Sequence, residues 1–488
     1  MAGIGFELKK LFRATGVLSV LRAYGYTGMI TAGPMLLGML FLMSISTIGK
    51  LSGLAKDDQD LLVCMITYSL IASMVITSLF SMVMTRYVAD LLYQEKDDLV
   101  IPSLEGILCF ELPFGGIIWG IFLAFSGTGL VLGMILFIFF MELLVAWTEM
   151  NYLTAIKDYK GIFLSYVFAI AAAVLVADLG CYIFGASLEI LILGVSIGYG
   201  IMVVYDLVLL YQYFPNSQKE HFAFLPWFDE YGELSAIGFF TNVGLFAHLV
   251  IAWGSEIGVN YRGLFYGAPQ HDVAALFAFI SILITTINFV ASVEVNFYPK
   301  YRRYYDLFNG AGSIIEIEQA ENEMMTVLEH ELIYTARRQF YGTSITLSIG
   351  LMILGRLPLG FDALMEGYFR ILCVGYGAYA VGNVLMLILM YFTDYADAKK
   401  ASFIFAVTTT VGSIFSLSID SKYYGFAFAL GSIIYFIYAL IKLMRYTKRL
   451  PYHILSSQPI VAEPKRGLAC ALYAHILRQQ DKRKRIDE

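Results

Sequence analysis

Acidic residues lie inside long apolar stretches of this chain. The clearest cases are Glu111, Glu142, Asp178, Asp206 and Glu294, while Glu105 and Glu149 lie nearer the ends of their stretches. An ionisable group in hydrocarbon is costly unless it faces water, protein or another charge, so each acid is a candidate for a transport pathway. Carboxylates there favour cationic cargo, a coupling cation or proton relay. Alternatively, each acid lies near an interface, is protonated or bonds to a neighbouring helix.

Neutral polar residues also interrupt the apolar stretches. Asn242 and Asn383 join the acids as candidate lumen residues, and His248 and Asn288 have similar positions. Each of these four side chains is more commonly a hydrogen-bonding group between helices than a ligand.

Glycine and proline suggest where helices bend or approach each other. Gly33 and Pro34 interrupt the first apolar stretch and predict a hinge, because proline removes one backbone hydrogen bond. A packing surface of small residues is the equal alternative. Two other pairs of glycines four residues apart predict close helix contact instead: Gly116 with Gly120, and Gly194 with Gly198.

The elements that position these residues are twelve stretches of about 17 to 24 mostly apolar residues, each long enough to cross a bilayer core as a helix. They cover 26–48, 61–84, 104–125, 130–148, 162–184, 188–212, 234–253, 273–295, 340–357, 369–392, 401–417 and 423–443. Their continuous apolar character excludes the alternating pattern of a barrel. The predicted fold is an all-α integral membrane protein with about 12 transmembrane helices.

Composition and charge support this prediction. Hydrophobic residues make up 59% of the 488 residues and charged residues only 15%, whereas a soluble domain has about 25% charged residues. Placing both termini in the cytosol leaves few Lys and Arg outside. The exceptions are Lys50, Lys56, Arg262, Arg356, Arg370 and Lys422. The sequence therefore predicts a multi-pass protein of the cytoplasmic (inner) membrane with both termini cytosolic.

Polar connections divide the chain into predicted domains. The connection at 214–233 contains two prolines and several charges, and separates two six-helix lobes. The domains are an amphipathic N-terminal segment 1–25, an N-terminal lobe 26–213, the cytosolic linker 214–233, a C-terminal lobe 234–449 with a cytosolic insertion 297–339, and a basic cytosolic tail 450–488. Duplicated halves of this kind recur in alternating-access transporters.

The cytosolic insertion has apolar residues near helical spacing with many glutamates between them, which predicts one long amphipathic helix. It covers its own lobe or docks a soluble partner. The candidate docking residues are Arg302, Arg303, Glu321 and Glu331.

Motifs for enzyme chemistry are missing from the sequence. There is no G-x-x-x-x-G-K-[ST] loop, and the five cysteines have no metal-ligand spacing. We therefore expect no metal, no cofactor and no catalytic residues. Asp57, Asp58 and Asp60 are the one group of acids that could contradict this expectation. They lie in the first predicted outer loop, and an acidic outer loop can hold a metal in membrane glycosyltransferases.

Two segments carry a resemblance to a known family. The chain opens Met1-Ala-Gly-Ile-Gly-Phe-Glu-Leu-Lys-Lys-Leu and continues to Ala23-Tyr-Gly-Tyr and Gly33-Pro34. Its insertion contains Phe297-Tyr-Pro-Lys-Tyr-Arg-Arg-Tyr-Tyr, followed by Glu316-Ile-Glu. Over nearly the whole chain the sequence resembles the Pel exopolysaccharide transporter family, PelG. That family is similar to the multidrug/oligosaccharidyl-lipid/polysaccharide flippase (MOP) superfamily, which includes the MATE transporters and has two six-helix lobes around a cavity.

The resemblance implies a function and partners. It implies a transporter that exports a growing exopolysaccharide (Pel), rich in N-acetylgalactosamine and galactosamine, across the cytoplasmic membrane for biofilm formation. The implied partners are a PelF-like cytosolic glycosyltransferase, a PelD-like cyclic di-GMP receptor and PelE-like membrane proteins. No nucleic acid is expected, and the resemblance assigns no residue that contacts the polymer.

Two alternatives remain. One is a cation-coupled exporter of drugs or lipid-linked oligosaccharides. The less favoured one is a membrane glycosyltransferase that uses the acidic outer loop.

Overall fold

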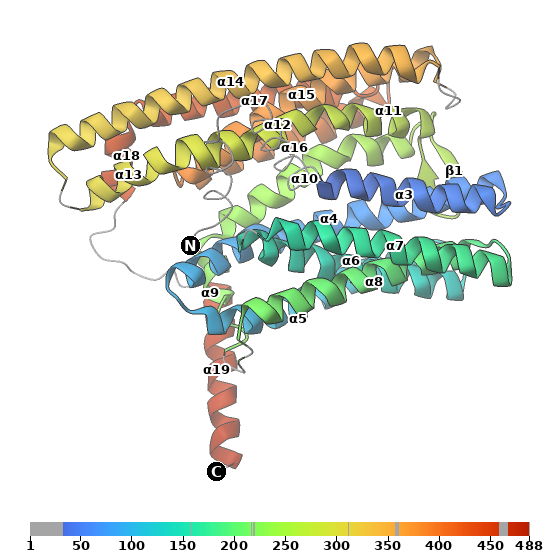
Figure 1. Cartoon of the computed structure of the whole chain (residues 1–488), viewed down its shortest axis with the longest axis horizontal. Helices are drawn as coiled ribbons and strands as arrows, with labels where there is room; N and C mark the ends of the chain where they lie inside the picture. Colours follow the sequence, from blue (N-terminus) through green and yellow to red (C-terminus); the bar gives the residue numbers. More distant parts are fainter. Residues whose placement is uncertain are drawn as a thin grey trace, which may run out of the picture. The chain divides into compact units, whose positions relative to one another are not determined.

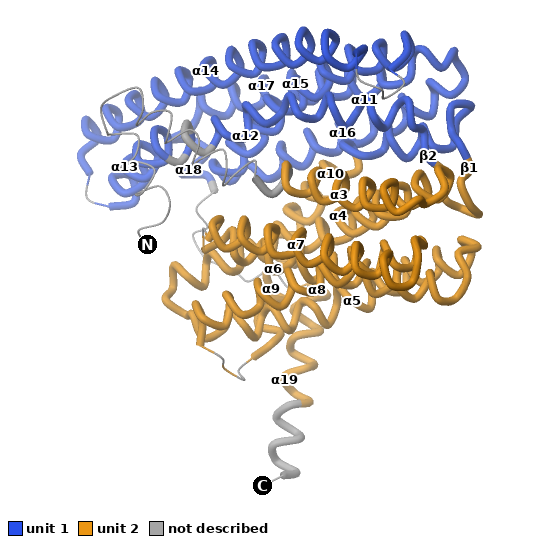
Figure 2. Tube along the Cα trace, turned by 45° about the vertical axis from the view of Figure 1, so that its right-hand side comes forward, with its two compact units in different colours: residues 1–34, 244–259, 267–457 blue, residues 35–243, 260–266, 458–488 orange. Residues whose placement is uncertain are grey.

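The computed structural model describes residues 33–156, 158–215, 217, 220–310, 312–356, 361–457 and 467–487. Its Cα trace divides into two compact units (Figure 2). Unit 1 is built mainly from residues 244–259 and 267–457, and unit 2 mainly from residues 35–243 and 260–266. Among the described residues, the regular elements are helices and one two-stranded sheet.

Unit 2 contains six long helices, which follow one another along the chain. They are α3 (Gly33–Leu51), α4 (Lys56–Tyr93), α5 (Val100–Phe125), α6 (Leu130–Ala155), α7 (Tyr159–Phe184) and α8 (Leu188–Tyr213), with a 3-10 turn at Asp97–Leu99. α8 packs against α6 and α7, and α6 packs against α4 and α5. The core between them is apolar, with Leu136, Phe139 and Leu191 fully buried.

Close contact between α7 and α8 depends on glycine. A Cβ atom on Gly198 would lie 2.7 Å from the Ala169 carbonyl oxygen, and one on Gly194 would lie 3.0 Å from the Ala177 Cβ. The first distance is too short for a side chain unless something shifts, and the second requires the neighbour to move by a few tenths of an ångström. The close packing predicted from these two glycines is confirmed. The same prediction is wrong for Gly116 and Gly120, where a Cβ atom would meet only side chains, at 3.4 Å and 3.7 Å.

Unit 1 begins within α10 (Gly232–Trp253), a helix that contributes to both units. Its other main helices are α11 (Pro269–Phe279), α12 (Leu283–Phe289), α13 (Tyr298–Asn309), α14 (Ile314–Leu354), α15 (Ala363–Tyr391), α16 (Tyr395–Ser416) and α17 (Phe426–Thr447). α15 is central, because it contacts α11, α14, α16 and α17.

Shorter elements complete the fold. Unit 1 also has the 3-10 turns Ile280–Ile282 and Ser421–Tyr423, a π-helix at Val290–Phe297 and α18 (Leu450–Ser457). The strands β1 (Val259–Arg262) and β2 (Phe265–Gly267) pair with each other, and residues 260–266 of this pair belong to unit 2.

A helix or run of helical turns lies in each of the twelve predicted membrane ranges, although residues 26–32 and 357 are outside the described part. Nine of the described helical segments are long and apolar enough to cross a membrane. The three ranges beyond these nine belong to α3, α14 and α16. The α14 range continues a charged helix, and α16 begins with several charged residues, which lowers the apolar content of each. The prediction of an all-α multi-pass membrane protein is confirmed.

The insertion at 297–339 contains the long amphipathic helix expected from the sequence, as part of α14, and a second helix that was not expected. It forms two helices, α13 and α14, which pack against each other at the upper left of Figure 1. Gly310 ends the first helix, and Ser313 begins the second through a reciprocal capping box with Glu316. α14 then runs without interruption into the predicted ninth span, so the insertion and that span share one helix of 41 residues.

The C-terminal tail contains α19 (Leu468–Asp487), which contacts the short helix α9 (Leu225–Glu230) in unit 2. The Asp229 carboxylate accepts the backbone N–H groups of Cys470 at 2.7 Å and Ala469 at 3.3 Å. Desolvation acts to raise the pKa of Asp229, but the hydrogen bonds to residues 467–470 together outweigh it and hold this pKa below its usual value. Tyr473 donates to Glu220 at 2.7 Å. The tail helix is therefore fixed at its N-terminus by an acidic cap.

Candidate functional site

Four of the candidate carboxylates of unit 2 come from three helices. α5 carries Glu111, α6 carries Glu142 and Glu149, and α8 carries Asp206. α6 packs against both α5 and α8, so acids that are widely spaced in the sequence lie on neighbouring helices of unit 2. The four carboxylates differ in burial and in hydrogen bonding, and these differences determine which of them can bind cargo, a cation or a proton.

Glu111 is fully buried and fully hydrogen-bonded. Thr77 on α4 donates to one carboxylate oxygen at 2.6 Å, and Thr148 on α6 donates to the other at 2.7 Å. A buried polar group is tolerated when its hydrogen bonds are made. Glu111 therefore joins three helices, which gives it a packing role whether or not it also faces cargo.

Glu149 and Asp206 form a different arrangement. Both side chains are buried, and they are near enough for their charges to interact. Among the described residues, no hydrogen bond within normal geometry reaches any of the four carboxylate oxygens, although the Ser165 hydroxyl lies near Asp206. Two like charges without partners in an apolar interior are strongly unfavourable. A proton or a cation must therefore neutralise at least part of this pair.

Glu142 is only partly buried and lies about two helical turns before Glu149 on α6. Ser196 on α8 donates to it at 2.7 Å. Gly200 leaves room for the Glu142 side chain, because a Cβ atom at position 200 would lie only 3.1 Å from a Glu142 oxygen. This carboxylate keeps acceptor capacity for a hydroxyl or amide group.

The remaining candidate residues of the membrane interior lie elsewhere. Asp178 is exposed on α7. Asn242 donates to the Gly238 carbonyl of its own helix at 3.0 Å, and Asn383 is partly buried on α15. Glu294 belongs to the π-helix, but its side chain lies outside the described residues. Their assignment to a lumen stays a prediction.

Unit 1 contains a polar seam of which the sequence had indicated only Asn288, as a hydrogen-bonding residue between helices. Gln339 on α14 accepts from Thr285 on α12 and donates to the Ser281 carbonyl at 3.0 Å. One turn away, Asn288 donates to Thr335 at 3.0 Å and accepts from Arg338 at 3.1 Å. The spacing of Thr335, Gln339 and Thr343 at every fourth residue was the signal available in the sequence. The seam ends at the π-helix, an irregularity that is frequent at functional sites.

Two buried histidines form a second polar cluster in unit 1. His248 on α10 lies 3.5 Å from His271 on α11 and 3.4 Å from the Tyr376 hydroxyl on α15, measured between polar atoms. His248 thus bonds between helices, as sequence reasoning favoured. His271 was not singled out, because it lies at the polar start of its helix.

The candidate docking residues are partly engaged within unit 1. Arg303 and Lys300 on α13 bind Glu323 on α14 at 3.0 and 2.8 Å, and the Lys300 hydrogen bond is the main cause that lowers the pKa of Glu323. Arg302 is exposed and pairs with Asp306 at 3.6 Å. Two partly buried glutamates complete the set: Glu331 accepts from Asn296, and burial raises the pKa of Glu321.

The predicted hinge and opening segment lie at the edge of the described residues. Gly33 and Pro34 are the first residues of α3, and their side chains are not described. The N-terminal segment 1–25 lies outside the described residues. The hinge and the residue boundaries of the predicted domains therefore stay predictions.

Solved structures share this fold. An outward-facing multidrug resistance MATE family transporter of the MOP superfamily is 12% identical, with a TM-score of 0.56 over 92% of this chain and 99% of that chain. A mutant form of the Vibrio cholerae MATE transporter VcmN gives a TM-score of 0.57 at 10% identity over 91% and 98% of the two chains. The eukaryotic MATE transporter AtDTX14 gives 0.53 at 12% identity over 89% and 99%. The chain therefore has the MATE transporter fold.

The sequence comparisons add the family. No curated protein matches the chain. A family model described as PelG, "Putative exopolysaccharide Exporter (EPS-E)", matches residues 1–455. This match includes all the described membrane helices and the α13–α14 insertion, so the chain is a multi-pass membrane transporter that belongs to the PelG family of exopolysaccharide exporters.

Proposed function

We propose that this protein exports a growing exopolysaccharide rich in N-acetylgalactosamine and galactosamine, the Pel polymer, across the cytoplasmic membrane. The observation that carries the proposal is the PelG family match over residues 1–455. The MATE fold supports it, since the solved proteins that share this fold are membrane transporters. In this proposal both termini are cytosolic, as the distribution of Lys and Arg favours.

The polymer is handed over at the cytosolic face of unit 1. α13 and α14 present Arg302 there as an exposed cation, while Lys300 and Arg303 hold the two helices together through Glu323. A PelF-like glycosyltransferase docks on this face in the proposed assembly, with PelD-like and PelE-like proteins as companions. Rigid pairing of the two helices supports such a role, because a preformed surface loses little entropy on binding.

The carboxylates of unit 2 have separate roles in export. Glu142 has the exposure and acceptor capacity to bind sugar hydroxyl or amide groups. The Glu149–Asp206 pair exchanges protons or a cation, because its charge has no neutralising partner among the described residues.

The first test separates export from synthesis. Cells with and without this protein are compared for extracellular N-acetylgalactosamine polymer, while transferase activity is assayed in lysates. Loss of extracellular polymer with intact transferase activity is expected. Unchanged extracellular polymer would contradict the proposal.

Docking is tested by reversing an exposed charge. Arg302→Glu is expected to weaken co-purification of the transferase, because Arg302 is an exposed cation of the docking face. Arg337→Glu, on an exposed position farther along α14, is the matched control. Equal co-purification of both variants would place the docking site elsewhere.

A cation-coupled exporter of drugs or lipid-linked oligosaccharides is the second candidate, and the Glu149–Asp206 pair favours it. Purified protein in proteoliposomes distinguishes the two candidates. Uptake of a small cation driven by a proton or sodium gradient would support the second one.

A membrane glycosyltransferase has less support. Asp57, Asp58 and Asp60 lie in the first turns of α4 and not in a loop as expected from the sequence. Asp58 pairs with Arg262 at 3.2 Å, a contact within unit 2 that gives it a structural role. Replacing Asp57, Asp58 and Asp60 by Asn should leave polymer export intact; abolished sugar transfer by the purified variant would instead support the enzyme.

A further inference from the structure

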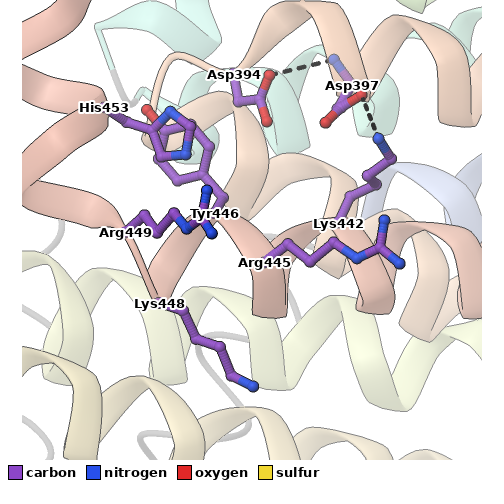
Figure 3. A pocket seen from close by; sticks show the side chains of 8 residues that line it. All are labelled: Asp394, Asp397, Lys442, Arg445, Tyr446, Lys448, Arg449 and His453. Atoms are coloured by element: carbon purple, nitrogen blue, oxygen red, sulfur yellow. Dashed lines mark hydrogen bonds and ion pairs between the residues drawn. The ribbon is translucent and has the colours of Figure 1, made fainter.

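A basic pocket lies at one end of unit 1. It has a volume of about 510 Å³ and is lined by Asp394, Asp397, Lys442, Arg445, Tyr446, Lys448, Arg449 and His453 (Figure 3). The lining comes from the turn between α15 and α16, the end of α17 and the start of α18. Ligand sites commonly have volumes of about 300–1,000 Å³.

The two carboxylates of the pocket are occupied by structural contacts. Asp394 caps α16 by accepting the Asp397 backbone N–H at 3.2 Å, and Asp397 binds Lys442 at 3.1 Å. Figure 3 shows both acids at the top of the view. They therefore neutralise only part of the positive charge of the lining.

Three cationic side chains of the pocket lining are not neutralised by a carboxylate. Among the described residues, no carboxylate forms an ion pair with Arg445, Lys448 or Arg449, which lie below the acids in Figure 3. The wall beside them is fixed: Tyr446 donates to the Phe392 carbonyl at 2.9 Å and stacks on His453 with ring centres 4.3 Å apart. Cations beside a rigid aromatic wall form a receptor for an anion.

We propose that this pocket binds a phosphate ester. Guanidinium groups match phosphate oxygens in pairs, and two arginines with one lysine supply the donors. The phosphate can come from an anionic lipid headgroup or from a soluble nucleotide.

The surface of α17 favours the lipid. An exposed apolar stripe runs along this helix through Leu430, Ile433, Ile437, Ile441 and Met444, at spacings of three and four residues. Lys448 follows at the same spacing, so the stripe ends at the pocket. Acyl chains can lie along the stripe while the phosphate enters the pocket. The distribution of Lys and Arg assigns this end to the cytosol, where the leaflet is rich in anionic lipids.

The test uses the full chain purified in neutral detergent and fluorescent phosphatidylglycerol or phosphatidylcholine as the probe. Wild-type protein should bind phosphatidylglycerol more tightly than phosphatidylcholine. The double variant Arg445→Gln/Arg449→Gln should lower the affinity for phosphatidylglycerol by about tenfold. Arg337→Gln/Arg478→Gln, which removes two exposed arginines elsewhere, should leave it unchanged.

Misfolding of the double variant would also lower the affinity for phosphatidylglycerol, so a second variant that should raise this affinity is needed. Asp397→Asn releases Lys442 into the pocket and should tighten phosphatidylglycerol binding. UDP and pyrophosphate form the soluble arm. If they bind in a manner that Arg445→Gln/Arg449→Gln removes, while phosphatidylglycerol shows no advantage, the phosphate site stands and the lipid source is overturned. Equal binding of all ligands by wild type and the double variant would overturn the site itself.

Discussion

Two buried acidic regions of unit 2 share helix α6 yet differ in how their charge is stabilised. At Glu111, hydroxyl groups from α4 and α6 satisfy both carboxylate oxygens. At Glu149 and Asp206, burial is equally deep, but within the described residues the oxygens lack hydrogen-bond partners. The first arrangement is stable in one state, whereas the second is stable only when something neutralises it. A mid-membrane acid is therefore informative about function only once its partners are known.

The largest effect is expected from neutralising the unsatisfied pair. Glu149→Gln/Asp206→Asn should reduce extracellular polymer by about tenfold or more, because a site that must take up and release a proton or cation contributes several kcal/mol to the cycle. The thermal unfolding temperature in detergent should stay equal or rise, since the variant buries no unpaired charge. Secreted polymer per unit of membrane protein is the measurement.

Glu189→Gln is the matched control, because it removes a carboxylate from the first turn of the same α8. It should leave export unchanged. Normal export by the double variant would show that Glu149 and Asp206 have only a structural role, like Glu111. The proposed functional difference between the two acidic regions would then be wrong.

A stability effect is expected at Glu111. Glu111→Ala should lower the free energy of unfolding by about 3 kcal/mol, because it leaves a cavity and removes the acceptor of two buried hydroxyls. Glu111→Gln should cost much less, since the amide still bonds to Thr77 and Thr148. Chemical unfolding of the purified protein measures both. A well-folded Glu111→Gln variant without export would show that this acid also takes part in transport.

A smaller stability effect is expected from one hydroxyl. Thr77→Val keeps the shape of the side chain but leaves a Glu111 oxygen without its donor, at a cost of about 1–3 kcal/mol in the free energy of unfolding. In the background of Glu111→Gln the cost should shrink. Equal costs in the two backgrounds would mean that Thr77 and the carboxylate are not coupled.

The smallest effect is expected at Gly200. Gly200→Ala places a Cβ atom 3.1 Å from a Glu142 oxygen, so the carboxylate must move by a few tenths of an ångström. We expect a loss of at most about 1 kcal/mol in stability and a modest change in export. A large loss of export at normal stability would show that the position of Glu142 is critical for cargo.

Much of the fold was predictable because the membrane restricts the chain to long apolar helices. The close contact at Gly194 and Gly198 was also predictable, since only glycine permits it. The amphipathic helix of the insertion was predictable from its apolar spacing, and it is part of α14. The separate helix α13 was not predicted, because the break after it depends on Gly310 and on the cap at Ser313. The polar seam of Gln339 was not predicted: polar residues at every fourth position of α14 mark one helix face, but only the packed structure shows that Thr285 and the Ser281 carbonyl meet it.

Residue order alone was enough to show that the chain is a helical membrane protein, which family it resembles and which acids lie in its apolar segments. These conclusions follow from local composition and motifs. The packed helices were needed to show that Glu111 bonds to two threonines, that the oxygens of Glu149 and Asp206 are buried without hydrogen-bond partners among the described residues, and that Arg445 and Arg449 line one pocket. The environments of these acids are formed by residues tens of positions apart on different helices. They depend on helix rotation and packing, which no local sequence pattern encodes.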